Sequence, residues 1–345
     1  IMDEPTSALS VTEVDVLFRV IRDLKRQGVS IVYISHRLEE VIQIGDYITV
    51  LRDGNLIQES SMNNIDLPWI ISNMVGDIHE QEVKHTSNST GEVVLKVENL
   101  RLPRVGGGYT VDHVNFNLCR GEILGIYGLM GAGRSELFEC LIGVQEETKG
   151  NVILDGKDVT IGTVNDHIRA GLSLIPEDRQ REGLVQVLDV KDNMTLSSLW
   201  KFAKSIHIQA DKILQAVRTM ISRLSIKVGG PQVIISSLSG GNQQKVIIGK
   251  GLLTEPKVLL MDEPTRGIDV GAKADVFGIM YELAARGLGI IFVTSELKEI
   301  MAVSDRIIVM SNGKMTGEYL REAATEEMIV AASAVGHKTE ERSLH

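Results

Sequence analysis

One short stretch of sequence constrains this chain more than any other. Residues 258–265 read VLLMDEPT, an aliphatic run that ends in two adjacent carboxylates, Asp262 and Glu263, and a proline. Such a run predicts a buried strand of a parallel sheet whose carboxyl end presents both acidic side chains at the sheet edge. There an aspartate suits Mg²⁺, and the next carboxylate can orient or deprotonate a water molecule. A strand that merely ends in a turn is the plain alternative.

The same stretch occurs a second time, at the start of the chain. Residues 1–6 read IMDEPT, and a shift of 259 positions lays residues 2–54 on residues 261–313 without a gap. The matched pairs include Asp3 with Asp262, Glu4 with Glu263, Phe18 with Phe277, Gly28 with Gly287, Leu38 with Leu297, Asp46 with Asp305 and Gly54 with Gly313. A match of this length indicates an internal duplication. Because the second copy begins near residue 93, we expect the first copy to be truncated at its N-terminal side.

Sequence pattern divides the chain into parts of these two copies. Residues 1–76 alternate helical and strand patterns, which predicts a parallel sheet covered by helices. Residues 77–92 are polar and without periodicity, as in a linker. The second copy, residues 93–334, is expected to begin with antiparallel strands and to contain an inserted helical subdomain at about 164–235. Residues 335–345 form a charged tail that is expected to fray.

Charge and cysteine content narrow the function classes. The formal net charge of −10 argues against a general nucleic-acid binder, which is usually basic. No apolar run reaches the 18 residues or so that a membrane-spanning helix needs. The two cysteines, Cys119 and Cys140, lack metal-site spacing and fit a reducing compartment. These features predict a globular protein of the cytosol.

Residues 128–135, GLMGAGRS, follow an apolar strand and precede an apolar helix. The pattern differs by one residue from the phosphate-binding loop G-x-x-x-x-G-K-[ST]. Glycines let consecutive backbone N–H groups converge on phosphate oxygens, and the helix N-terminus adds its dipole. A structural glycine turn is the alternative, but the carboxylate-tipped strand downstream favours nucleotide binding. The residues assigned to ATP here are Gly128, Gly131, Ala132, Gly133, Arg134 and Ser135, of which Ser135 would also hold Mg²⁺.

Residues 238–245, LSGGNQQK, begin a helix about twenty residues before the second carboxylate stretch, and here the sequence resembles the ATP-binding-cassette family. The order of phosphate loop, helical lobe, LSGGNQQK and LLMDEPT is the family's order over essentially the whole chain. The resemblance implies an α/β P-loop NTPase cassette with a parallel core sheet, an antiparallel β subdomain and an inserted helical subdomain. The C-terminal part of a first cassette would precede it. Ser239, Gly240 and Gly241, at a helix N-terminus, would cap the γ-phosphate of a nucleotide held by another cassette.

The resemblance also implies roles for the carboxylates and for one histidine. Asp262 would be associated with Mg²⁺, and Glu263 would polarise the attacking water. Asp3 and Glu4 would do the same in the first cassette, where His36 matches the switch histidine that contacts the γ-phosphate.

Tyr109, which lies 25 residues before Arg134, is a candidate to stack on adenine. An aromatic side chain beside the glycine-rich turn at residues 106–108 equally suits packing, and both interpretations stay open.

Three positions of the second cassette depart from the family pattern. Ser295 stands where the duplication aligns His36, Glu177 stands where the family usually has glutamine, and Arg134 replaces the loop lysine. Hydrolysis needs a positioned water and neutralised charge in the transition state, so these changes should weaken it. We expect the second cassette's own site to bind nucleotide and hydrolyse it slowly, full activity being the alternative. In the family, LSGGNQQK would serve the first cassette's site.

Two fused cassettes with these motifs resemble the ATPases of bacterial sugar importers of the ribose, galactose, xylose and autoinducer-2 type. That resemblance implies ATP and Mg²⁺ as cofactors, paired cassettes, membrane permease subunits and a periplasmic sugar-binding protein as partners, and no nucleic acid. It places the chain peripherally on the cytoplasmic face of the inner membrane. A tandem-cassette ATPase acting on ribosomes or DNA is the alternative, disfavoured by the short linker and the acidic charge. A purely regulatory pseudo-ATPase is a third possibility, and the sequence does not define the sugar.

Overall fold

A computed structural model describes residues 1–3, 5–6, 11–35, 38–52, 55–66, 69–70, 73, 91–204 and 207–335. The chain divides into two compact units, the first built from residues 1–83 and the second from most of residues 84–345. Among the described residues, no helix combines the length and apolar character needed to cross a membrane.

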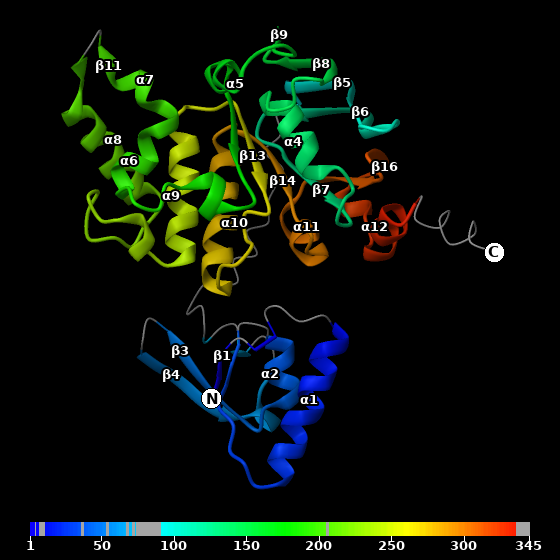
Figure 1. Cartoon of the computed structure of the whole chain (residues 1–345), viewed down its shortest axis with the longest axis vertical. Helices are drawn as coiled ribbons and strands as arrows, with labels where there is room; N and C mark the ends of the chain where they lie inside the picture. Colours follow the sequence, from blue (N-terminus) through cyan, green and yellow to red (C-terminus); the bar gives the residue numbers. More distant parts are fainter. Residues whose placement is uncertain are drawn as a thin grey trace. The chain divides into compact units, whose positions relative to one another are not determined.

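The first unit is a small α/β structure (Figure 1). Its elements are β1 (Met2–Asp3), α1 (Val11–Arg26), β2 (Tyr33–Ile34), α2 (Leu38–Ile44), β3 (Tyr47–Arg52), β4 (Asn55–Ser61) and the 3₁₀ turn η1 (Met62–Asn64). Strands β1 and β2 are parallel, and β3 and β4 form an antiparallel pair. In the parallel pair, Met2 lies opposite Tyr33 and Asp3 lies opposite Ile34.

A six-stranded sheet forms the centre of the second unit. In spatial order its strands are β10 (Leu172–Ile175), β13 (Val258–Asp262), β14 (Gly289–Val293), β7 (Ile123–Gly128), β15 (Arg306–Ser311) and β16 (Lys314–Leu320). The first five are mutually parallel, and β16 is antiparallel to β15. Every residue of β7, β13 and β14 is buried, as expected for parallel strands covered on both faces.

Successive residues of each strand face two separate hydrophobic cores. In β13, Leu259 and Met261 join a core formed with the helices α9, α10 and α11, whereas Val258 and Leu260 join a core formed with the antiparallel strands and α4. The four helices are α4 (Arg134–Ile142), α9 (Gly240–Leu252), α10 (Val270–Ala285) and α11 (Leu297–Val303). The sheet therefore packs between two layers, and this packing fixes the positions of the strand ends that carry the motifs.

The second unit also contains an antiparallel sheet of four strands, of which β5 and β6 precede β7 in the chain and β8 and β9 follow it. In spatial order these are β6 (Tyr109–Cys119), β5 (Val93–Pro103), β8 (Lys149–Leu154) and β9 (Lys157–Asp158). The predicted antiparallel start of the second copy is confirmed by the pairing of β5 with β6.

Helices gather at the opposite side of the second unit, where Figure 1 shows α6, α7 and α8 beside α9. The remaining elements are α5 (Val164–Ala170), η2 (Arg179–Gly183), α6 (Val190–Thr195), η3 (Leu196–Ser198), α7 (Leu199–Phe202), β11 (Ala203–Lys204), β12 (His207–Ile208), α8 (Ala210–Arg223), η4 (Ile235–Ser237), η5 (Arg321–Ala323) and α12 (Glu326–Ser333). The expected helical segment 164–235 starts too early, because β10 lies within it and belongs to the central sheet. A run of four residues, LSLI, between helical patterns is too short for periodicity to identify as a strand.

Candidate nucleotide-binding site

The loop between β7 and α4 depends on glycine at particular positions. Gly131 and Gly133 have φ of 79° and 90°, in the left-handed region that favours glycine. A Cβ on Gly133 would lie 2.6 Å from the carbonyl oxygen of Thr110, and one on Gly128 would lie 2.5 Å from that of Met310. The loop is thereby held close to β6 and β15, and its backbone passes directly into the first turn of α4. This arrangement suits a phosphate cradle at a helix N-terminus.

Ser135 and Asp262 meet next to this loop. The Asp262 side chain ends β13 and is 5% exposed, and the nearby Ser135 hydroxyl favours its ionised form. Burial raises the pKa of Asp262 from 3.8 to about 6, and the neighbouring Glu263 charge adds to the shift. Within the part of the chain that the structure describes, its Oδ1 has no hydrogen-bond partner. A buried, unpartnered carboxylate oxygen beside a hydroxyl fits the all-oxygen ligand set that Mg²⁺ prefers, so Ser135 and Asp262 could hold the ion.

Glu263 follows Asp262 in a conformation that costs energy. Its φ is 45°, a region that a non-glycine residue seldom adopts. The Ser295 hydroxyl donates to Glu263 Oε2 at 3.3 Å, and Arg134 Nη2 lies 3.6 Å from Glu263 Oε1. Strained backbone at a carboxylate beside a phosphate loop is typical of functional positions. The structure therefore brings Arg134, Ser135, Asp262, Glu263 and Ser295 together.

Arg134 takes part in this cluster through both ends of its guanidinium. Nη1 donates to the Thr294 carbonyl at 3.0 Å, while Nη2 faces Glu263. The side chain thus links the first turn of α4 to the ends of β13 and β14. A lysine ammonium is a compact point charge and cannot hold two partners in this forked manner.

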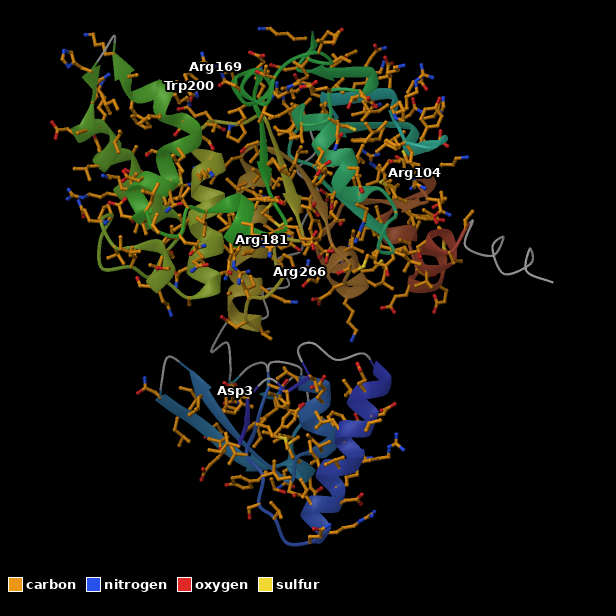
Figure 2. The ribbon with its side chains drawn as sticks, viewed as in Figure 1. Asp3, Arg104, Arg169, Arg181, Trp200 and Arg266 are labelled. Atoms are coloured by element: carbon orange, nitrogen blue, oxygen red, sulfur yellow. The ribbon has the colours of Figure 1, made fainter. Side chains whose placement is uncertain are left out.

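Glu177 and Arg179 follow β10 and contact the segment that follows β13. Glu177 forms an ion pair with Arg266, which is labelled in Figure 2. Arg179 donates to the carbonyl oxygens of Arg266 at 2.6 Å and of Gly267 at 2.9 Å. Since β10 and β13 are neighbouring strands, their carboxyl ends meet at one edge of the sheet. The Glu177 carboxylate is therefore held by Arg266 at this edge.

The LSGGNQQK turn lies at the N-terminus of α9, as the sequence predicts. Ser239 is the N-cap residue, and its hydroxyl accepts a hydrogen bond from Asn242 Nδ2 at 2.9 Å. A Cβ on Gly241 would lie 2.4 Å from the Ala272 Cβ, and one on Gly240 would lie 2.9 Å from Arg179 Nη2. Close packing thus requires both glycines, and Arg179 connects this turn to residues 266 and 267.

Tyr109 begins β6 and is 37% exposed. Its ring meets His113 edge-on, with the ring centroids 5.3 Å apart. The next residue, Thr110, contributes the carbonyl oxygen that approaches Gly133. Tyr109 therefore lies one residue from a contact of the phosphate loop, and part of its ring surface packs on His113.

Two of the predicted catalytic residues, Glu4 and His36, lie outside the described residues. Asp3 is described at the end of β1, where it is exposed and pairs with Ile34 of β2 (Figure 2).

Sequence reasoning missed three residues that shape this site: Arg179, Arg266 and Glu299. No spacing rule singles them out, although Arg179 and Arg266 stand close in sequence to Glu177 and Glu263. Glu299 follows the switch position by four residues and is buried, which no periodicity argument distinguishes from an ordinary helix residue.

The fold and these motifs define a P-loop nucleotide-binding cassette. Solved structures agree: a nucleotide-free ATP-binding cassette from an ABC transporter covers 72% of this chain and 98% of its own, with a TM-score of 0.60 and 23% identity. CbiO1 from Clostridium perfringens gives a TM-score of 0.59 at 23% identity, covering 73% of this chain and 96% of its own.

The ABC transporter family model matches residues 111–266, and the chain belongs to the ATP-binding-cassette family. It is 44% identical over 336 residues to a xylose import ATP-binding protein, XylG, of Brucella abortus, covering 96% of this chain and 66% of that protein. It is 45% identical over 336 residues to XylG of Pseudomonas savastanoi pv. phaseolicola, covering 96% of this chain and 65% of that protein. The chain thus spans about two thirds of the length of these relatives.

Proposed function

We propose that this chain is part of an ATP-binding and ATP-hydrolysing subunit that powers import of a sugar across the cytoplasmic membrane. The observation that carries the proposal is 44–45% identity, over 96% of the chain, to proteins named for xylose import. The cluster of phosphate loop, Ser135, Asp262 and Glu263 supports it, because these groups suit Mg²⁺-ATP. A pentose such as xylose is the first sugar to test.

The proposed partners follow from the same relationship. An import ATPase acts with membrane permease subunits and, in bacterial sugar uptake, with a periplasmic sugar-binding protein. We place the chain peripherally on the cytoplasmic face of the inner membrane. Closure of paired cassettes on ATP would then drive alternating access in the permease.

Residues 1–76 are proposed to be the C-terminal part of a first cassette, residues 77–92 a linker, residues 93–334 a second cassette and residues 335–345 a tail. Strand register supports the duplication. Met2 pairs with Tyr33 and Asp3 with Ile34, and the positions 259 residues later pair in the same way, Met261 with Phe292 and Asp262 with Val293. Residues 77–90 and 336–345 lie outside the described residues.

The nucleotide site of the second cassette is proposed to bind ATP and to hydrolyse it slowly. The contacts of the three departing residues support this. Ser295 reaches Glu263 with a hydroxyl that cannot carry the positive charge of a histidine. Arg134 lies between Glu263 and Thr294, and Glu177 is held by Arg266. Each contact occupies a group that hydrolysis would otherwise use on water, metal or phosphate.

The turn formed by Ser239, Gly240 and Gly241 is proposed to serve the nucleotide of the first cassette. Glu4 and His36 would then act as catalytic carboxylate and switch histidine there, with Asp3 on Mg²⁺. Tyr109 is proposed to stack on the adenine of the second cassette's own nucleotide, and its 37% exposure supports this.

Co-purification of the tagged full-length protein from membranes tests the transporter assignment. Recovery of permease subunits, and ATP turnover that rises with binding protein and sugar, would support it. Recovery of ribosomes or nucleic acid without permease would favour the tandem-cassette ATPase that acts on those substrates.

A further inference from the structure

Glu299, in the first turn of α11, is a buried carboxylate that receives three hydrogen bonds. Its Oε2 accepts from the Thr265 hydroxyl at 2.7 Å and from the Thr294 hydroxyl at 2.9 Å. Its Oε1 accepts from Lys273 Nζ at 2.8 Å. Both threonines are at most 2% exposed, so this is a built interior arrangement rather than a surface contact.

The two threonines belong to the two segments that meet at the nucleotide site. Thr265 follows Glu263 by two residues, and Thr294 immediately precedes Ser295. The Thr294 carbonyl also accepts the hydrogen bond from Arg134. A single carboxylate oxygen therefore sets the spacing between the end of β13 and the end of β14, and with it the 3.3 Å contact from Ser295 to Glu263.

A buried carboxylate needs compensating charge, and Lys273 supplies it. Burial works against the charge of Lys273, but hydrogen bonds and charges from Glu296 and Glu299 outweigh it, and the pKa of Lys273 is raised. The ammonium thus remains charged, and its charge compensates that of the carboxylate that accepts from both hydroxyls.

The first unit contains the same arrangement at the equivalent positions. The Thr6 hydroxyl donates to Glu40 Oε2 at 2.7 Å, and the Tyr33 hydroxyl donates to the same oxygen at 2.9 Å. Thr6 and Glu40 are buried and 34 residues apart, as are Thr265 and Glu299. The second donor differs between the copies, whereas the threonine–glutamate bond occurs in both. The presence of this bond in both copies of the duplicated segment argues that the bond has a positional role.

We propose that Glu299 is a positioning residue, which holds the water-polarising carboxylate segment at a fixed distance from the switch segment, and that Glu40 does the same in the first unit. This inference rests on the proposed ATP hydrolysis for its effect on turnover. In the first unit, Thr6 follows Glu4 by two residues and Glu40 follows His36 by four, so Glu40 connects the segments that carry both. Glutamine at these positions keeps the size of the side chain but removes the charge and one acceptor oxygen.

Hydrogen exchange in the full-length protein without nucleotide tests the positioning role of Glu299. The variants are Glu299→Gln and, as a matched control on an exposed helix start, Glu326→Gln. We expect Glu299→Gln to increase exchange at least threefold at residues 263–266 and 294–296 together, with little change in β8 or α12. Unchanged exchange in these two segments, or an equal rise throughout the chain, would overturn the proposal.

Turnover by Glu40→Gln tests the corresponding role in the first unit. We expect kcat for ATP to fall about tenfold while KM stays within twofold, and Glu40→Asp to recover part of the loss. A rise in KM without a fall in kcat would contradict the positioning role of Glu40. An unaltered protein that hydrolyses no ATP under any condition would sink the proposed function, while the exchange measurement would still decide on Glu299.

Discussion

Asp262, the residue proposed to bind Mg²⁺, lies where its charge lowers the stability of the fold. Burial raises its pKa to about 6, so the folded chain holds this proton more tightly than the unfolded chain does. Its contribution to stability is therefore fully present below about pH 3.8 and is lost as the pH rises to about 6. Above that range, the ionised carboxylate is a net cost until a cation neutralises it.

Asp262→Asn should stabilise the metal-free protein at pH 7.5 by roughly 1–3 kcal/mol, because it removes a buried charge while keeping the shape. The gain should disappear near pH 4. Mg²⁺-ATP should raise the melting temperature of the unaltered protein and have much less effect on the variant. Thermal unfolding with and without Mg²⁺-ATP measures both effects. A variant less stable than the unaltered protein at pH 7.5 would show that Asp262 is held by interactions within the chain.

Arg134 offers a test of the phosphate loop. We expect Arg134→Ala to weaken ATP binding about tenfold or more, since it removes a charge-assisted contact of roughly 1.5–3 kcal/mol. Arg134→Lys keeps the positive charge and should bind within about threefold of the unaltered protein. Titration with a fluorescent ATP analogue measures this, and equal affinity in all three proteins would exclude a role on phosphate.

The site residues that could be predicted from the sequence differ physically from those that could not. Ser135 and Asp262 belong to motifs whose spacing reflects one ligand, so their meeting follows from the motifs. Arg266 contacts Glu177 only because β10 and β13 are neighbouring strands. The sequence pattern does not reveal this, because β10 falls within the segment that is expected to be helical. Contacts that depend on strand order cannot be obtained before the topology is known.

Among the elements, the loop from β7 to α4 combines positive-φ glycines with a close backbone contact. Gly131 and Gly133 both have positive φ, but only Gly133 lies against backbone, with a Cβ position 2.6 Å from the Thr110 carbonyl oxygen. At Gly131 the same construction meets nothing within 4 Å. Alanine substitutions at these two positions therefore distinguish the cost of a left-handed backbone conformation from the cost of a steric clash.

Gly131→Ala should lower the free energy of unfolding by about 1 kcal/mol, the strain of a left-handed alanine. Gly133→Ala should cost roughly 1–3 kcal/mol more, because β6 must move to admit the methyl group. Denaturant unfolding of both variants measures the difference. Equal losses would mean that the loop shifts freely and is not fixed against β6.

The bounds of a helix or strand were predictable where the polarity of both its faces, or the residues that cap it, allowed one interpretation. Strands β7 and β13 lie in the apolar runs that precede the phosphate loop and the two adjacent carboxylates. Helix α1 buries Phe18 and Ile21 but leaves Val20 48% exposed, although all three side chains are apolar. Which part of an apolar face is covered depends on neighbouring elements, and local periodicity does not specify them.

At the scale of the whole molecule, the two units share a strand register and a buried threonine–glutamate bond but differ in the residues at their proposed nucleotide sites. The second unit has Ser295 at the switch position and holds Glu177 and Arg134 in internal contacts. The first unit has histidine at the equivalent position, His36. We propose that hydrolysis depends on the first unit, whereas the second unit mainly binds nucleotide and presents its signature turn.

Steady-state ATP turnover of the full-length protein, with Glu4→Gln compared against Glu263→Gln, tests this division of roles. Each change removes the carboxylate charge that is proposed to polarise water at one site and leaves the side-chain volume nearly unchanged. We expect Glu4→Gln to lower kcat at least a hundredfold, whereas Glu263→Gln should keep kcat within about threefold of the unaltered protein. A greater loss of activity in Glu263→Gln than in Glu4→Gln would contradict it.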